Sequence, residues 1–471
     1  MKKTKIVATL GPACDGPGIL EQMIEGGVNV FRLNFSHGTP KDHARRIKAV
    51  RDVAQKSKLP VAILQDISGP KIRIGELSGR VAELRAGDLL KLTTKKIMGN
   101  RRQISVNYAG LPKDVKKSNS LFLADGLIEV EVLSTDRTII QCRVLNGGRL
   151  TSHQGINFPD GTLHAEVITE KDKRDMAFGV EAGVDIVALS FVRDPKDIKQ
   201  ARALLAHLGK GRIPIIAKIE KHEALDRLDA IVQVSDGVMV ARGDLGVEIP
   251  LQQVPLAQKK IITHARQMGK PSIVATHMLA SMVARPRPTR AEVTDITTAV
   301  LDSADALMLS EETAVGKYPV ESVLMMCSII QVAEQSLNHR RLLDDTPVGN
   351  TVSDSISQAA CIMAEDLRAK VIITPTAFGS TAQRVSRFRP RQNILALSHN
   401  PSILRFLNLN WGIVPIEIPR AHTLDDLFKI SLHAAKVNGR AKKGDIAVVT
   451  AGVPLNKSGT TNLIKVERIE S

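Results

Sequence analysis

The sequence predicts an α/β protein built on a closed (β/α)8 barrel, and two observations lead to this fold. Eight short apolar runs recur along the chain, and helical periodicity fills most of the intervals between them. Such runs are typical of parallel strands that are buried on both faces and followed by helices. Nearly every run ends in a polar residue, as expected where the carboxyl ends of barrel strands form a functional site. The predicted strands lie in residues 5–11, 29–37, 60–67, 185–193, 213–220, 237–246, 271–278 and 306–313.

The barrel units are unevenly spaced along the chain. The third predicted strand ends near Ile67, and the fourth begins only near Asp185, after a helical segment at 169–182. Between the seventh and eighth strands, Thr289 and Glu292 have the spacing of a capping box, which predicts a helix that begins there. We regard this motif as structural.

The interval between the third and fourth strands predicts a separate all-β domain. Short alternating segments at 89–97, 119–133 and 138–148 are joined by turn signals such as Ala124-Asp125-Gly126. A domain inserted at this point interrupts a βα loop, and βα loops lie at the mouth of the barrel. We therefore expect a small β barrel that covers the mouth of the larger one.

A third domain is expected after about residue 340. New apolar runs at 370–376, 393–398 and 445–452 predict strands, and they alternate with predicted helices at 352–367, 381–387 and 424–437. This alternation is typical of an open α/β domain. The predicted domain limits are 1–69 and 167–339 for the barrel, 70–166 for the insert, and 340–471 for the C-terminal domain.

Composition narrows the class of protein. The net charge of +16 would suit either a nucleic-acid-binding barrel or an enzyme with polyanionic substrates, but aromatic residues for base stacking make up only 3%. We therefore favour the enzyme and expect no nucleic-acid partner. The 4 cysteines are far apart without a C-x-x-C motif, which predicts a reducing, cytoplasmic location. No run approaches the ~18 apolar residues of a membrane span, so we expect no membrane partner.

Two carboxylates are expected at neighbouring strand tips, Glu220 after the fifth strand and Asp244 after the sixth. Paired carboxylate oxygens suit Mg²⁺ or Mn²⁺. Lys218 lies two residues before Glu220, so both side chains should share one face. A lysine beside a metal-binding carboxylate pair is expected in phosphoryl transfer, although a Lys–Glu pair could also merely fill the top of the barrel. Gly243 would let the backbone approach a ligand closely.

The second and third strands offer further polar groups. Arg32, Asn34 and Ser36 alternate along one strand, and Arg32 is suited to a phosphate or a carboxylate. Asn34, Ser36 and Asp66 together could hold a cation.

Two loops of the C-terminal domain are candidate anion sites. The loop from Thr374 to Thr381 precedes a predicted helix, whose N-terminal N–H groups could bind an anion, and a similar loop spans 454–461. An ordinary capped turn would explain the first loop equally well.

An ordered set of motifs resembles the pyruvate kinase family over essentially the whole chain. The motifs are KIVATLGPA, RLNFSHG, GPKIR, ITEKDK, AKIE, MVARGDLGVEIP, ATHML, RPTRAEVTD and LSEETAVGKYPVE. The resemblance implies transfer of a phosphoryl group from phosphoenolpyruvate to ADP, which gives pyruvate and ATP and requires Mg²⁺ or Mn²⁺. It also implies a homotetramer, a phosphorylated allosteric effector, and a lid role for the inserted domain.

The same resemblance implies roles for individual residues. Glu220 and Asp244 would bind the divalent metal, and Lys218 would stabilise the phosphoryl group in transfer. Thr276 and Ser310 would help to protonate the enolate. Arg32 would contact phosphate, and Gly243 and its neighbours would bind the substrate carboxylate. The nucleotide would be bound by Asn34, His37 and Arg73, and a monovalent cation by Asn34, Ser36, Asp66 and Ile67. The effector would be bound by Thr374, Thr376, Ser380, Thr381, Ser458 and Gly459. His37 could instead be an ordinary exposed or structural histidine.

Several positions depart from the family pattern. Ile67 replaces a threonine, and Lys71 replaces a glutamate that accompanies potassium dependence in the family. The ammonium group of Lys71 would supply the positive charge that K⁺ otherwise brings, so we expect that K⁺ is not required. His277 and Glu311 also depart from the usual motifs, and no role is predicted for either.

Without the resemblance, the strand tips leave a second enzyme class open. A Mg²⁺-dependent lyase or aldolase that stabilises a pyruvate enolate would also use paired carboxylates, but would need neither the lid nor Lys218.

Overall fold

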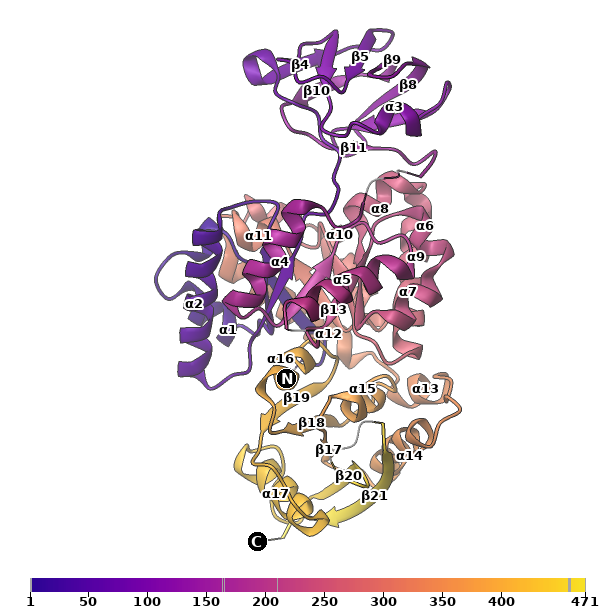
Figure 1. Ribbon diagram of the computed structural model, residues 1–471. Coiled ribbons are helices and arrows are strands. Elements are labelled where there is room, and N and C mark those ends of the chain that lie inside the picture. The colour runs from indigo at the N-terminus through magenta and orange to yellow at the C-terminus, as the bar shows by residue number, and fades with distance from the viewer. Residues whose placement is uncertain (1, 163, 165, 210, 456–458, 471) are drawn as a thin grey trace.

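Residues 2–162, 164, 166–209, 211–455 and 459–470 are described in a computed structural model (Figure 1). The eight predicted runs form one closed parallel barrel in the order β1-β16-β15-β14-β13-β12-β3-β2. The (β/α)8 prediction is therefore confirmed. The barrel strands are β1 (Lys5–Thr9), β2 (Val30–Asn34), β3 (Ala62–Asp66), β12 (Ile186–Leu189), β13 (Ile215–Ile219), β14 (Gly237–Ala241), β15 (Ser272–Ala275) and β16 (Ala306–Leu309).

Helices surround the barrel, and side-chain caps set several of their starts. Thr39, Thr169, Asp194 and Thr289 each open a helix with a capping box, and the box predicted at Thr289 and Glu292 is among them. The helices of this layer are α1 (Ile19–Glu25), α2 (Pro40–Ser57), α4 (Glu170–Ala182), α5 (Pro195–His207), α6 (His222–Asp226), α7 (Leu228–Val234), α8 (Arg242–Glu248), α9 (Val254–Gln267), α10 (Arg290–Leu301), α11 (Glu311–Ala314) and α12 (Pro319–Gln335), with short 3-10 turns η1 (Pro12–Cys14), η3 (Leu251–Gln253) and η4 (Ala280–Val283).

Apolar side chains fill both faces of the barrel strands. Alternate residues such as Ile6 and Ala8 pack outward against the helices, whereas Val7 packs inward with its counterparts on the other strands. The inward cluster also contains Phe406 and Leu409 from the C-terminal domain. This domain therefore closes the end of the barrel at which the strands begin, as Figure 1 shows below the barrel.

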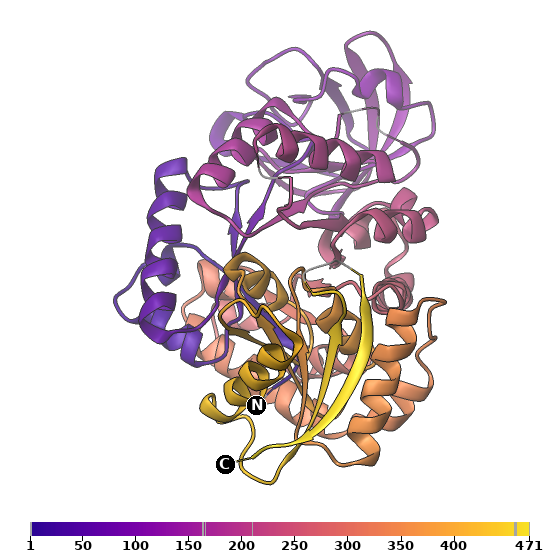
Figure 2. The ribbon, with the colours of Figure 1, turned by 60° about the horizontal axis from the view of Figure 1, so that its bottom comes forward.

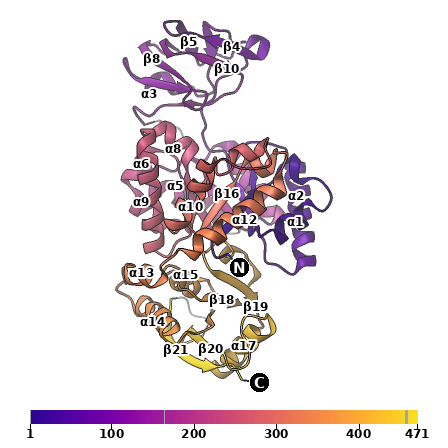
Figure 3. The same ribbon diagram turned by 180° about the vertical axis from the view of Figure 1, so that it is seen from behind.

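The inserted segment lies at the opposite end, where the strands terminate (Figure 3). Its strands form a six-stranded sheet, β11-β7-β8-β9-β5-β6, and a two-stranded sheet, β10-β4. Isolated bridges from Arg73 to Gly155 and from Ile74 to Val106 join the two edges of the larger sheet, so the closure is irregular. The elements are η2 (Ser78–Arg80), β4 (Val81–Leu84), β5 (Leu89–Thr93), β6 (Gln103–Ser105), α3 (Leu111–Asp114), β7 (Ser120–Leu123), β8 (Ile128–Thr135), β9 (Ile139–Asn146), β10 (Gly148–Thr151) and β11 (Ile156–Asn157).

The C-terminal domain is an open sheet in the order β19-β18-β17-β20-β21, with β21 antiparallel to β20 (Figure 2). This arrangement agrees with the predicted open α/β class. Its elements are α13 (His339–Asp344), α14 (Val352–Asp366), β17 (Val371–Pro375), α15 (Ser380–Ser386), β18 (Asn393–Ser398), α16 (Pro401–Leu407), β19 (Ile413–Glu417), α17 (Leu424–Val437), β20 (Ile446–Gly452) and β21 (Thr461–Arg468). The exact domain limits given above stay a prediction. In the described part of the chain, no helix has the length and apolarity needed to cross a bilayer.

A buried ion pair joins the C-terminal domain to the barrel. Arg389 Nη2 lies 2.9 Å from Asp305 Oδ2, and the same nitrogen donates to the carbonyl of Ser303 at 2.9 Å. Asp305 Oδ1 accepts from the backbone N–H of Trp411 at 3.0 Å. Both charged side chains are almost fully enclosed, so neither could lose its partner without leaving an uncompensated charge.

We predict that Arg389→Met lowers the free energy of unfolding by about 3–5 kcal/mol, because Asp305 would remain buried without a cation. Urea titration followed by circular dichroism measures this change. Arg391→Met is the matched control: Arg391 is 67% exposed and pairs with Glu365 at the surface, so its loss should cost about 1 kcal/mol or less. Equal midpoints for the two variants would contradict the role of the buried pair.

Candidate active site

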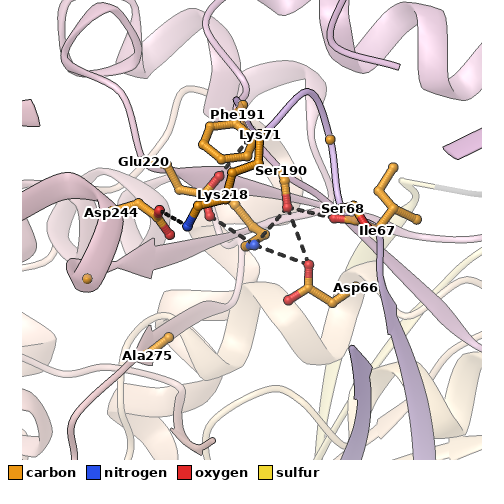
Figure 4. Close-up of polar contacts among 12 residues, drawn as sticks. Asp66, Ile67, Ser68, Lys71, Ser190, Phe191, Lys218, Glu220, Asp244 and Ala275 are labelled. Carbon is orange, nitrogen blue, oxygen red and sulfur yellow. Dashed lines mark hydrogen bonds and ion pairs between the residues drawn. The ribbon is translucent and has the colours of Figure 1, made fainter. Parts of the chain in front are cut away.

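A compact network of charged groups occupies the mouth of the barrel, where β2, β3 and β13 end (Figure 4). Lys218 Nζ lies 3.1 Å from Asp66 Oδ1 and 2.9 Å from Glu220 Oε1. Arg32 Nε lies 2.7 Å from Asp66 Oδ2. The structure thus brings together Arg32, Asp66, Lys218 and Glu220, and Lys218 and Glu220 share one face, as the period of a strand predicts.

The electrostatics of the network favour charged forms of Lys218 and Asp66. Burial alone would raise the pKa of Asp66, but the charges of Lys218 and Arg32 outweigh it and hold that pKa below its ordinary value. Burial would lower the pKa of Lys218, yet Asp66 and Glu220 raise it well above that of an ordinary lysine. Lys218 is therefore a permanent cation in the barrel mouth.

Glu220 has the properties of a cation ligand. Burial and the nearby charge of Asp244 raise the pKa of Glu220, while Lys218 opposes the shift. The backbone N–H of Phe191 fixes one of its oxygens by a 2.6 Å hydrogen bond to Oε2. A divalent cation would relieve the repulsion between the two carboxylates, and their oxygen-only donor set fits Mg²⁺ or Mn²⁺.

The sequence suggested that Asp244 ends the sixth strand, but the structure places it beyond that strand. Strand β14 ends at Ala241, and Asp244 lies in the first turn of α8 (Arg242–Glu248), because the helix starts directly at Arg242. Its Oδ1 accepts a 3.0 Å hydrogen bond from Lys71 Nζ, and the same ammonium group lies 3.9 Å from Asp125 in the inserted domain. Asp244 still faces the network (Figure 4).

The residues expected to hold a monovalent cation make hydrogen bonds to one another or to neighbouring side chains. Asn34 Oδ1 accepts from the backbone N–H of Ser36 at 3.1 Å, and the hydroxyl groups of Ser36 and Ser68 are 3.2 Å apart. The carbonyl of Ile67 accepts from Ser190 Oγ at 2.7 Å. Among the described residues, the ion-pair partners of Lys71 are Asp244 and Asp125, so its ammonium group stands beside the carboxylate pair and not within this set.

Thr276 lies next to α8 in a strained backbone conformation. Its φ of 72° is in the left-handed region, which a β-branched residue rarely adopts. Arg242 holds the segment in place because Nη2 donates to the carbonyl of Thr276 at 2.6 Å and Nη1 pairs with Asp295 at 2.6 Å. The backbone N–H of Gly243 donates to Thr276 Oγ1 at 2.9 Å. The structure thus unites Gly243 and Thr276.

Ser310 is positioned by a residue that the sequence did not single out. Buried Glu312 accepts hydrogen bonds from the backbone N–H groups of Ser310 at 2.7 Å and Leu279 at 2.9 Å. One carboxylate therefore joins the loops that follow β15 and β16. Glu311, next to it, is exposed to solvent.

A cavity of about 480 Å³ lies between the barrel and the inserted domain. Ser36, Lys71, Arg73, Tyr108 and Lys171 are among its lining residues. Arg73 extends from the inserted domain and donates from Nη1 to the carbonyl of His153 at 3.0 Å. His37 is not among the lining residues, and its backbone carbonyl contacts the ring of His43 at 3.0 Å. Arg73 therefore lines this cavity, and His37 does not.

Ser190 is a second residue that sequence patterns missed. Its Oγ accepts a 2.7 Å hydrogen bond from Lys218 Nζ and donates to the carbonyl of Ile67. The only available signal was its position, because Ser190 directly follows the fourth barrel strand, at the level of the other polar strand tips.

The two candidate anion loops of the C-terminal domain meet at one cavity of about 70 Å³. Thr376, Ser380, Thr381 and Gly459 line it, and the hydroxyl groups of Thr381 and Thr461 are 2.7 Å apart. Thr374 is buried within β17 and is not among the lining residues, because its hydroxyl group donates to the carbonyl of Leu395. Ser458 lies outside the described residues.

Comparisons with known proteins agree with this geometry. A family model described as pyruvate kinase, barrel domain, matches residues 1–323, and one described as pyruvate kinase, alpha/beta domain, matches residues 354–467. A pyruvate kinase from Thermotoga maritima is 45% identical and covers 100% of both chains. One from Geobacillus stearothermophilus is 43% identical over 99% of this chain and 80% of its own. A crystal structure of a pyruvate kinase from Cryptosporidium parvum has a TM-score of 0.93 at 36% identity, covering 99% of this chain and 96% of that chain.

We predict that Glu312→Gln lowers the free energy of unfolding by about 1–3 kcal/mol, because two backbone N–H groups lose a charged acceptor. The amides of Leu279 and Ser310 should also exchange faster with deuterium, as measured by hydrogen-exchange mass spectrometry. Glu311→Gln is the control on the same loop and should change neither quantity. Unchanged protection of both amides in Glu312→Gln would contradict the bridging role.

Proposed function

The chain belongs to the pyruvate kinase family of phosphotransferases, and on that basis we propose that its barrel mouth performs the family reaction with Lys218, Glu220 and Asp244 at the centre. Phosphoenolpyruvate gives up its phosphoryl group to ADP, and pyruvate and ATP are formed. The observation that supports these roles best is the position of Lys218, held as a cation between Asp66 and Glu220. Because the chain belongs to a family of phosphotransferases, we do not retain the alternative of a lyase or aldolase.

Lys218 and Arg32 act on the phosphoryl group. The bond between phosphorus and the enol oxygen breaks while ADP oxygen binds phosphorus, so negative charge is spread over the three equatorial oxygens. Lys218 supplies a fixed positive charge that needs no reorganisation during the step, because Asp66, Glu220 and Ser190 already orient its ammonium group. Arg32, held by Asp66, contributes a second cation.

Glu220 and Asp244 would hold the divalent cation, Mg²⁺ or Mn²⁺. When bound, this ion supplies charge neutralisation for the phosphoryl and enolate oxygens. Lys71 contacts Asp244 and must share this carboxylate with the ion. Lys71 thereby adds a protein cation beside the reacting groups, so the enzyme does not require K⁺.

The enolate left after transfer takes up a proton at carbon. Thr276 and Ser310 stand on the seventh and eighth strand tips and help to deliver this proton, with Thr276 held by Gly243 and Arg242. The backbone around Gly243 receives the substrate carboxylate. Glu312 keeps the two strand tips in register.

The inserted domain acts as a lid over the reaction. The cavity between the lid and the barrel receives the nucleotide, with Arg73 on the lid side and Ser36 on the barrel side. Asn34 does not line this cavity and acts there through Ser36, whose backbone N–H it holds. Closure excludes water, which would otherwise compete with ADP for the phosphoryl group. His37 contributes to the nucleotide site only if the loop after β2 rearranges.

Regulation and assembly follow from the family resemblance. A phosphorylated metabolite binds the cavity lined by Thr376, Ser380 and Thr381, where hydroxyl groups gather at the start of α15. Thr374 has no part in this contact. The chain forms a homotetramer and works in the cytoplasm.

We predict that Lys218→Met lowers kcat by about 10²–10³-fold, the scale of losing one electrostatic contact to the transition state. Pyruvate formation from phosphoenolpyruvate and ADP is measured by coupling to lactate dehydrogenase. Lys173→Met is the control, because Lys173 lies at the surface of α4 and pairs only locally with Glu170 among the described residues. A folded Lys218→Met variant with unchanged kcat would contradict the assignment, and absence of product with the unaltered protein would refute the function.

We predict that the reaction rate changes by less than about twofold when K⁺ is replaced by tetramethylammonium at equal ionic strength, because Lys71 supplies a resident cation. Lys71→Glu should create activation by K⁺, since it removes this charge and adds a carboxylate near Asp244. The same coupled assay measures both. Strong K⁺ activation of the unaltered protein would defeat the prediction.

A further inference from the structure

Three side chains with metal-binding atoms lie together on α6 and α8, the helices that follow β13 and β14. His222 and Glu223 open α6, two and three residues after Glu220, and Glu248 ends α8, four residues after Asp244. The two segments that carry the carboxylate pair therefore also carry this second cluster. Its potential ligand atoms all lie within 4.8 Å of one another.

Two separations within this cluster match those of ligands around one ion. His222 Nδ1 lies 3.4 Å from Glu223 Oε2 and 3.4 Å from Glu248 Oε2. Ligand atoms bound tetrahedrally at about 2.0–2.1 Å are about 3.4 Å apart. The contact from His222 to Glu248 is also a long hydrogen bond in the absence of an ion. His222 is 31% exposed, so an ion could enter from solvent.

Glu223 supports a cation at this cluster independently of the spacing. Both of its carboxylate oxygens are enclosed, and neither has a hydrogen-bond partner among the residues that the structure describes. A buried carboxylate without donors is costly, and the long contact to His222 compensates it poorly.

Glu248 is oriented so that one oxygen remains available. Lys221 Nζ donates to Oε1 at 2.6 Å, and Asn157 Nδ2 from the base of the lid donates to the same oxygen at 3.4 Å. Oε2 faces His222, with Nδ1 at a hydrogen-bond distance of 3.4 Å. Hydrogen bonds to the non-ligating oxygen are the usual support of a carboxylate ligand. Asn157 Oδ1 is also enclosed and lacks a donor among the described residues, so it could accept from a metal-bound water.

We propose that His222, Glu223 and Glu248 form a second divalent-metal site that takes Zn²⁺. One imidazole with two carboxylates suits a borderline ion, unlike the oxygen-only pair Glu220 and Asp244. The ion would join α6 to α8 and so fix the spacing of the segments that hold Glu220 and Asp244. Three protein ligands leave a fourth position for water.

The test is the Zn²⁺ content of the full-length protein after equilibrium dialysis, measured by elemental analysis. The unaltered protein should retain one more equivalent per chain than His222→Gln and than Glu223→Gln at the same free Zn²⁺ concentration. Zn²⁺ should also raise the unfolding temperature of the unaltered protein more than that of either variant. His207→Gln, at an exposed position in the last turn of α5, is the matched control and should retain the full amount.

The difference in Zn²⁺ content between the variants does not depend on the proposed reaction. The unaltered protein and the three variants all keep Glu220 and Asp244, so any Zn²⁺ that this pair binds is present equally in all of them. Equal Zn²⁺ content in the unaltered protein and His222→Gln would overturn the proposal. The cluster would then be an ion-pair network in which a protonated imidazole serves both carboxylates. Loss of the ion in only one of the two cluster variants would equally contradict a three-ligand site.

Discussion

The site depends on one constraint, which is the cost of burying charged side chains in the mouth of an apolar barrel. Asp66 and Glu220 are only 2% and 1% exposed, and a carboxylate buried to this extent is stable only beside a cation. Lys218 stands between them and satisfies both. The position of this cation is therefore determined by folding itself, before any ligand binds. Electrostatic catalysis requires this kind of preorganisation.

The two ends of the barrel are held by different kinds of contact. At the closed end, Phe406 and Leu409 complete the apolar interior, and Arg389 is held by Asp305 and backbone carbonyls. At the open end, the insert meets the barrel through polar contacts, such as those of Lys71 with Asp244 and Asn157 with Glu248. Polar contacts of this kind can be exchanged for contacts with water, so we expect motion of the inserted domain and not of the base.

The sequence predicted the barrel because its strands are buried on both faces and stand out as apolar runs. It also predicted that Lys218 and Glu220 share a face, since a strand repeats every two residues. It misplaced Asp244, because nothing in the run before Arg242 marks the change from strand to helix. Ser190 and Glu312 were missed for a different reason.

The partners of both missed residues lie in segments that follow other strands. Ser190 contacts the carbonyl of Ile67, and Glu312 contacts the N–H of Leu279. Such contacts arise only when the barrel closes, and no local spacing records them. The same reason explains why the sequence did not indicate that Lys71 pairs with Asp244.

Lys218 remains charged because two buried carboxylates surround it. The most direct test is an NMR titration of protein labelled at lysine side chains, with the Lys218 signal assigned by its absence in Lys218→Met. We expect a Lys218 pKa above the ordinary lysine value of about 10.4, so its signal should not shift below that pH. Titration of Lys218 at or below the ordinary value would contradict its role as a permanent cation.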